Sequence, residues 1–218
     1  MNLAISGKMA TGKSTLANKI ADELDNEELS IADKIKEIAE LHTPELLDNT
    51  GKLSPKLTQH LLDLFGQIPI NDFNKALLAV GNIFYSYDPV EGKNRPLLQD
   101  LGQTLVDIKS DVWIDYLIND ELPKHDRVVV DDMRFPIEMD LLRQEDFYTV
   151  RLETDEEVRK ERLKEKYGII KEEWLTHNTE TALDDARFDI KIDNTDLTVE
   201  ETFEKLVDKV GKIKSIER

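Results

Sequence analysis

A short glycine-rich stretch near the N-terminus carries residues that can hold a triphosphate. Residues 7–14 read Gly-Lys-Met-Ala-Thr-Gly-Lys-Ser and fit the pattern G-x-x-x-x-G-K-[ST] at every position. Glycine lets such a loop curl until successive N–H groups point at phosphate oxygens. Lys13 adds a positive charge for the β and γ phosphates, and Ser14 adds a hydroxyl for Mg²⁺. The nucleotide-contacting residues are predicted to be Gly7, Lys8, Met9, Ala10, Thr11, Gly12, Lys13, Ser14 and Thr15.

The elements beside this stretch have the order that the motif requires. Residues 2–6 predict a buried strand, and residues 14–24 predict a helix with Leu16, Ile20 and Leu24 on one face. A helix N-terminus adds partial positive charge where the phosphates would lie. The alternative, a chance glycine-rich turn, does not account for the strand and helix on either side.

A second strand ends in two carboxylates. Val128 to Val130 are followed by Asp131 and Asp132, as in a strand that supports magnesium beside a nucleotide. Either carboxylate could order Mg²⁺ through its waters or accept a proton, and we predict Ser14 and Asp131 as the metal ligands. The alternative is that these acidic residues end a strand at the surface.

Strands and helices alternate along much of the remaining chain. Further strands are predicted at residues 29–32, 127–130, 147–152 and 188–192. Between 42 and about 119 the pattern is mostly helical and is interrupted by prolines. This alternation favours an α/β sandwich with a largely parallel sheet. We predict a single domain over 1–218, with a core at about 1–42 and 120–218 and a helical insertion at about 43–119.

Composition narrows the classes of function. The chain has 218 residues, a formal net charge of −17 and no cysteine. The acidity argues against a protein that coats nucleic acid, because such binding uses Lys and Arg against phosphates. The absence of a long apolar run or an export signal predicts a cytoplasmic protein without a membrane segment. Its expected partners are small-molecule nucleotides, and a homodimer is left open.

Four stretches together resemble one known family, the bacteriophage-type deoxynucleoside monophosphate kinases. Residues 131–138 read DDMRFPIE and resemble that family's D-V-R-F-P-N-E signature. Residues 31–39 look like its F-A-D-P-L-K-E-I-A segment, and residues 177–183 are similar to its H-x-S-E-x-x-L stretch. Residues 95–102, continuing to 111–113, look like its R-x-L-L-Q-x-x-G … D-x-W block. The order matches from residue 1 to about 195.

The resemblance implies a three-layer P-loop kinase sandwich with a helical acceptor-binding insertion and a helical lid at about 154–178. It also implies transfer of the γ-phosphate of ATP, with Mg²⁺, to a deoxynucleoside monophosphate. The sequence departs from the family at Lys34, where Pro is common, and at Met133, where Val is common. Residues 42–87 have no counterpart, so the base that is accepted stays open.

An acceptor monophosphate needs cations of its own, and a guanidinium suits it best. Arg134 and Arg95 lie in matched stretches and are the first candidates, with Lys36 third. Arg134 could instead form a structural ion pair with Glu138, four residues on. Gln99 either binds the base edge or caps a helix. The predicted substrate-binding residues are Asp33, Lys36, Arg95, Gln99, Arg134, Arg151 and Glu180.

A basic cluster follows the strand at 147–152. Arg151 ends the strand, and Arg159 and Arg162 share a face of the next helix. In closing kinases, lid arginines spread the charge of the transferring phosphoryl group. The alternative is a solvated charged helix, since glutamates surround them. The predicted catalytic residues are Lys13, Asp131, Asp132, Arg134, Arg159 and Arg162.

Two further stretches have less specific roles. His177 and Glu180 have no accompanying metal constellation, so a supporting or acceptor-binding role is predicted. Asn194 lies in a loop that resembles the one beside adenine in many P-loop kinases, although a plain turn would look the same.

Two other functions are compatible with a P-loop. One is a kinase of another phosphorylated metabolite, such as dephospho-coenzyme A. The other is an NTP-binding regulatory protein that hydrolyses slowly, although no N-K-x-D guanine-reading motif is present.

Overall fold

The computed structural model describes residues 1–42, 55–66, 69–88, 94–170, 175 and 177–216. The chain forms two compact units, one built from Met1–Ser30 and Leu122–Arg218 and the other from Ile31–Glu121. Our sequence prediction ended the first part of the core at about residue 42, whereas the structure groups Ile31 onward with the helical unit. Parts of the predicted insertion (43–54, 67–68 and 89–93) and lid (171–174 and 176) lie outside the described residues.

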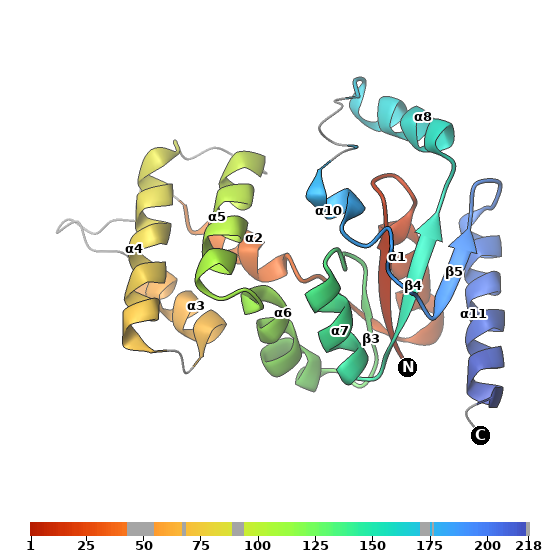
Figure 1. Cartoon of the computed structure of the whole chain (residues 1–218), viewed down its shortest axis with the longest axis horizontal. Coiled ribbons are helices and arrows are strands. Elements are labelled where there is room, and N and C mark those ends of the chain that lie inside the picture. Colours follow the sequence, from red (N-terminus) through yellow and green to blue (C-terminus); the bar gives the residue numbers. More distant parts are fainter. Residues whose placement is uncertain (43–54, 67–68, 89–93, 171–174, 176, 217–218) are drawn as a thin grey trace. The chain divides into compact units, whose positions relative to one another are not determined.

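The first unit is built on a five-stranded sheet (Figure 1). Its strands are β1 (Asn2–Gly7), β2 (Glu27–Leu29), β3 (Val128–Val130), β4 (Phe147–Glu153) and β5 (Ile190–Asp193). Every pairing is parallel and the spatial order is β2-β3-β1-β4-β5. The predicted α/β sandwich with a parallel sheet is confirmed. In such sheets, ligands bind beyond the carboxyl ends of the strands where the strand order reverses, here around β1.

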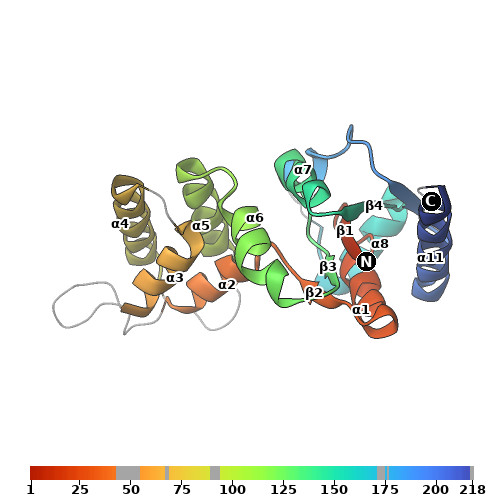
Figure 2. The same cartoon turned by 90° about the horizontal axis from the view of Figure 1, so that it is seen from below.

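Helices cover both faces of this sheet, as Figure 2 shows. Helices α1 (Lys13–Leu24) and α11 (Val199–Ile216) pack together on one face, and α7 (Pro136–Gln144) covers the other. The remaining helical elements are η2 (Leu122–Lys124), α8 (Glu156–Tyr167) and α10 (Asn178–Thr181).

The side chains of the central strand β1 alternate between the two faces of the sheet, and both faces are covered. Leu3 and Ile5 point into the apolar cluster that α1 and α11 complete with Leu16, Ile20 and Leu206. Their neighbours in the strand face the opposite way, as the period of two requires. Complete burial of such apolar side chains stabilises the fold by roughly 1.5–3 kcal/mol each. The strand therefore gives the loop that follows Gly7 a rigid base.

Several predicted boundaries differ from the structure. The second strand was predicted at 29–32, but β2 ends at Leu29 because its pairing with β3 runs out at Val130. The last strand was predicted from residue 188, whereas β5 begins at Ile190. Within the predicted lid, α8 begins at Glu156, and Asp155 is its N-cap, accepting hydrogen bonds from Glu157 N at 2.9 Å and Val158 N at 3.4 Å.

The second unit is helical. It contains α2 (Asp33–Glu40), α3 (Pro55–Phe65), α4 (Ile70–Ser86), α5 (Arg95–Ile108), α6 (Val112–Tyr116) and the π-helical turn η1 (Leu117–Glu121). Its interior is apolar and includes Leu61, Val80, Leu101 and Leu105, which are fully buried. Among the described residues, none of these helices is long and apolar enough to cross a bilayer, and the same holds in the first unit.

Candidate nucleotide site

The loop between β1 and α1 curls tightly because Gly7 and Gly12 allow it. A Cβ on Gly7 would lie 2.6 Å from Thr11 Oγ1 and 2.9 Å from Leu152 O, so only glycine fits there. Gly12 adopts φ 87°, in the left-handed region that favours glycine. Ala10 also has a positive φ, 66°, which is strained for a residue with a side chain. The loop thus takes the curled form that the motif predicts.

The first turn of α1 and the end of β3 come together at this loop. Ser14 Oγ donates a hydrogen bond to Asp131 Oδ2 at 2.5 Å. A hydroxyl and a carboxylate at this spacing, beside N–H groups for phosphates, fit Mg²⁺, which prefers oxygen ligands and retains several waters. Within the described part of the chain, no group of three or more His, Cys, Asp or Glu residues forms a separate metal cluster.

Asp132 faces a different partner from Asp131. Its Oδ2 accepts a hydrogen bond from Ser30 Oγ at 2.7 Å, just beyond the end of β2. The sequence left open which of the two carboxylates acts near the metal, and the geometry places Asp131 beside Ser14.

Lys13 lies over the loop rather than extending into solvent. Its Nζ donates to Gly7 O at 2.6 Å and to Lys8 O at 3.1 Å. Burial, together with the nearby guanidinium of Arg134, lowers the Lys13 pKa from 10.5 to about 8. Phosphate oxygens arriving at the loop would favour the charged ammonium and oppose this shift.

Arg134 reaches the loop through a carboxylate. Its NH1 donates to Glu180 Oε1 at 3.2 Å, and Glu180 Oε2 accepts the N–H of Met9 at 2.5 Å. The alternative in which the Arg134 guanidinium pairs with Glu138 is wrong. The Glu138 carboxylate instead accepts the backbone N–H groups of Arg134 at 2.6 Å and Phe135 at 2.9 Å.

Glu138 therefore fixes the backbone that carries Arg134. It is buried at the start of α7, and this burial raises its pKa to about 7, although the two N–H donors act in the opposite direction. Pro136 opens α7 at a position where no N–H is needed.

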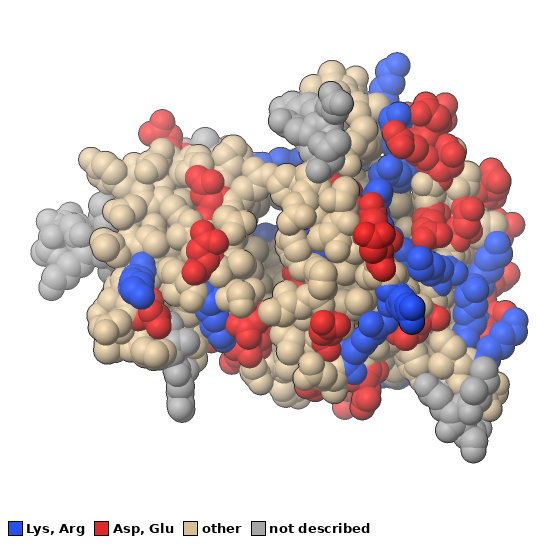
Figure 3. Space-filling model, viewed as in Figure 1, with Lys and Arg blue, Asp and Glu red and all other residues tan. Residues whose placement is uncertain are grey.

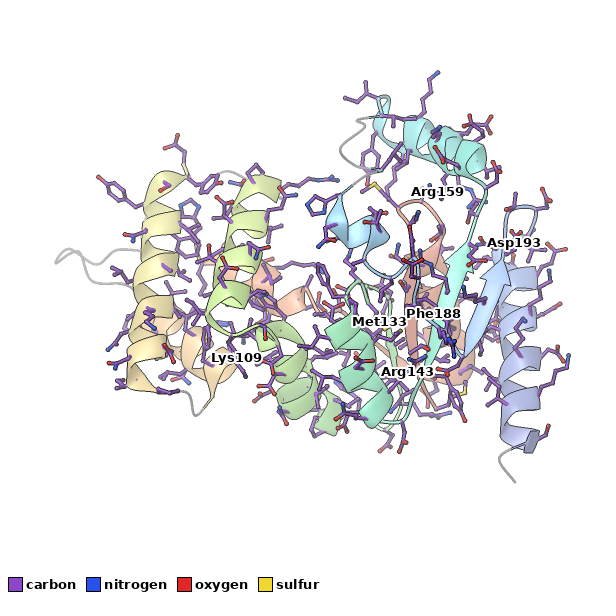
Figure 4. All side chains as sticks on the ribbon, viewed as in Figure 1. Lys109, Met133, Arg143, Arg159, Phe188 and Asp193 are labelled. Atoms are coloured by element: carbon purple, nitrogen blue, oxygen red, sulfur yellow. The ribbon has the colours of Figure 1, made fainter. Side chains whose placement is uncertain are left out.

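Two arginines of α8 contact the carbonyls of the loop. Arg159 NH1 donates to Met9 O at 3.4 Å, and Arg162 NH1 donates to Ala10 O at 3.3 Å. Figure 4 shows Arg159 below α8, on the side of the helix toward the loop. Arg159 is buried and so is not part of a purely solvated charged face. Figure 3 shows that Lys and Arg side chains run from α8 past β4 and β5 among the acidic ones.

Arg151, in β4, bonds the end of β1 that precedes the loop. Its register partner in β1 is Ser6, and Arg151 NH1 donates to Ser6 Oγ at 3.0 Å. Its NH2 donates to Asp184 Oδ1 at 2.6 Å, and Asp184 Oδ2 also pairs with Lys8 Nζ at 2.8 Å. Asp184 was not predicted from the sequence, because its partners lie far away along the chain and no spacing links them.

Asn194 contacts the loop from the position directly after β5. Its Nδ2 donates to Thr11 O at 2.9 Å, and its Oδ1 accepts the hydroxyl of Thr154 at 2.6 Å. Both polar ends of this buried amide are therefore bonded to the protein. Thr15, in the first turn of α1, is exposed.

The remaining predicted substrate residues belong to the second unit. Lys36 Nζ pairs with Asp33 Oδ1 at 2.7 Å on α2, and Arg95 is the first residue of α5. Asp33 is the first helical residue rather than the N-cap, which is Ala32. Gln99 lies within α5, whose N-cap is Asn94, with Oδ1 accepting Leu97 N at 3.2 Å.

Comparisons with known proteins give a likeness in structure alone. No protein-family model and no curated sequence matches the chain. An uncharacterized protein from Eubacterium ventriosum is 13% identical with a TM-score of 0.47, over 97% of this chain and 98% of that one. A gluconokinase from Sinorhizobium meliloti is 15% identical with a TM-score of 0.43, over 97% and 92%. A dephospho-CoA kinase from Campylobacter jejuni is 18% identical with a TM-score of 0.44, over 100% and 98%. Likeness at this level says nothing of substrate or mechanism.

Proposed function

We propose that this protein is an ATP-dependent phosphotransferase that moves the γ-phosphate to a deoxynucleoside monophosphate. The observation that carries the phosphotransferase is the meeting of three parts at one loop. The P-loop follows the central strand, and the Ser14–Asp131 pair lies at its end. Arg159 and Arg162 of α8 donate to its backbone carbonyls, and Arg134 reaches it through Glu180. The acceptor class rests on the resemblance of the four sequence stretches.

On the donor side, the loop N–H groups and Lys13 bind the phosphates, and Ser14 and Asp131 hold Mg²⁺ directly or through water. Bound Mg²⁺ would neutralise charge on the phosphates. Phosphoryl transfer needs little covalent chemistry from the protein, so positioning and charge stabilisation supply most of the rate. Arg159 and Arg162 supply that charge once their bonds to the loop carbonyls exchange for phosphate oxygens.

On the acceptor side, we propose Arg134, a role supported by its hydrogen bond to Glu180 beside the P-loop. Asp33, Lys36, Arg95 and Gln99 remain predictions for acceptor contacts, supported by the resemblance. Arg151 bonds Ser6, Asn194 bonds the Thr11 carbonyl and Asp132 bonds Ser30. We propose that these three residues support the shape of the site rather than contact the acceptor.

The test is a coupled ADP-release assay with Mg-ATP and a panel of phosphorylated acceptors. Stimulation by one or more deoxynucleoside monophosphates, well above that by ribonucleotides, is the expected result. Stimulation by dephospho-coenzyme A alone would keep the phosphotransferase and replace the acceptor. Slow ADP release that no small acceptor accelerates would instead favour the regulatory protein.

A further inference from the structure

The Glu180 carboxylate lies at the P-loop between two hydrogen-bond donors that suit an anion. Its side chain is only 4% exposed, and one carboxylate oxygen takes the Met9 N–H while the other takes the Arg134 guanidinium. A loop N–H and a neighbouring arginine are the donors that a phosphate group uses. The carboxylate therefore stands where a phosphate oxygen of the bound nucleotide would accept the same hydrogen bonds.

A carboxylate and a phosphate cannot share these donors. Two like charges a few ångströms apart repel strongly away from bulk water, and the Met9 N–H can be donated to only one acceptor at good geometry. Nucleotide binding must then move one of them. The segment that follows Glu180 is tied to the rest of the unit by the ion pairs of Asp184 with Lys8 and Arg151.

We propose that Glu180 is an internal anion that fills the phosphate position of the P-loop and is exchanged for a phosphate of the incoming nucleotide. Its side chain rotates away while the anchored backbone of the segment stays in place. This exchange frees the Arg134 guanidinium from Glu180 for a substrate phosphate. Arg134 thus reaches the transferring group only when a nucleotide is bound. The inference rests on the proposed function, since it concerns the same donor site.

The other cationic side chains of the site bond to loop carbonyl oxygens. Lys13 Nζ donates to loop carbonyls, and Arg159 and Arg162 also donate to loop carbonyls. The carbonyls hold these cations at the edge of the loop. Among the residues that the structure describes, Glu180 is the acidic side chain that bonds a loop N–H. Removing its charge should therefore favour an incoming anion.

The experiment measures binding rather than turnover. Isothermal titration calorimetry follows Mg-ATP and Mg-tripolyphosphate binding to the wild type, Glu180→Gln and Glu180→Asp, with folding checked by circular dichroism. Glu180→Gln removes the charge at constant shape, and Glu180→Asp shortens the reach to Met9. We expect both ligands to bind about tenfold more tightly to each variant, as for the loss of a competing hydrogen bond from a charged group. Tripolyphosphate has no base, so a shared effect locates the competition at the phosphates.

The matched control is Asp185→Asn, which removes one negative charge from the same segment at an exposed position. Its affinities should equal those of the wild type. Unchanged or weaker binding by both Glu180 variants, while the wild type binds Mg-ATP, would overturn this inference and leave the proposed function standing. Failure of every folded protein to bind either ligand would overturn both. Binding by the Glu180 variants alone would support the exchange.

Discussion

Ser14 Oγ and Asp131 Oδ2 lie 2.5 Å apart, although 117 positions separate them in the chain. The contact forms because β1 and β3 are neighbours in a parallel sheet, so the loop after one strand meets the residue after the other. It joins the phosphate-binding loop to the first carboxylate beyond β3.

Removing either partner should weaken the binding of Mg²⁺ at the site. For Ser14→Ala and Asp131→Asn we expect the apparent Mg²⁺ affinity in the ATP-dependent reaction to fall about tenfold to a hundredfold. A magnesium titration at fixed ATP measures this. Asp132→Asn is the matched control, because Asp132 bonds Ser30 instead, and its magnesium midpoint should stay near that of the wild type. A larger shift for Asp132→Asn than for Asp131→Asn would reverse the assignment.

Lys13 predicts a proton-linked binding reaction. Its pKa is about 8 without nucleotide, and a bound triphosphate would raise it, so binding takes up protons near and above pH 8. The affinity for Mg-ATP should therefore fall as pH rises from 8 toward 10. Calorimetry in buffers of different ionisation enthalpy, at pH 8.5, measures the uptake directly. Zero net uptake would show that the Lys13 ammonium is already fully charged before binding.

The same shift predicts how stability varies with pH. The folded pKa of Lys13 lies below its unfolded value of 10.5, so the unfolded chain holds more protons between about pH 8 and 10.5. The wild type should gain stability relative to Lys13→Met as pH rises through this window. Denaturant unfolding of both proteins at several pH values checks the trend.

The α8 arginines should act on turnover more than on nucleotide binding. For Arg162→Ala we expect kcat to fall roughly a hundredfold or more, because its charge is used when the phosphoryl group transfers. Lys164→Ala, on the exposed side of the same helix, is the control and should keep wild-type kcat. Arg162→Lys should recover little activity if the planar guanidinium is required. Normal kcat in Arg162→Ala would return this helix to a solvated charged face.

Glu138 should make the stability of the fold depend on pH in the opposite direction to Lys13. Its folded pKa of about 7 exceeds the unfolded value of 4.5, so the stability that it contributes is complete below pH 4.5 and is lost as pH rises through 7. Glu138→Gln removes this dependence, so the variant should gain on the wild type across the window, by on the order of 3 kcal/mol. Thermal unfolding at pH 4.5 and 7.5 tests this, with the exposed Glu145→Gln as control. Parallel pH curves for wild type and Glu138→Gln would contradict it.

Local sequence signals predicted the parts of the site that lie within one stretch. The P-loop and the β3 strand with its two aspartates follow from residue spacing and from β-branched residues. The residues that complete the site from distant parts of the chain could be identified only from the fold. Glu180 accepts the Met9 N–H and Asp184 pairs with Lys8, contacts between distant parts of the chain that no local spacing reveals. The buried Glu138 carboxylate accepts the backbone N–H groups of Arg134 and Phe135, because a buried polar group needs hydrogen-bond partners.

The unit boundary and the end of β2 were less predictable for a similar reason. Residues 31–41 carry the same helical pattern whether they pack on a sheet or on other helices, so periodicity could not assign them. The strand end was misplaced because it depends on where β3 stops pairing rather than on the apolar residues that follow Leu29.

The most direct test of the phosphotransferase is the transfer of label from γ-labelled ATP to a deoxynucleoside monophosphate, for wild type and Lys13→Ala in parallel. The account predicts a labelled diphosphate with the wild type and none with Lys13→Ala, while circular dichroism shows both proteins folded. Equal labelling by a folded Lys13→Ala protein, or label released only as inorganic phosphate by the wild type, would contradict it.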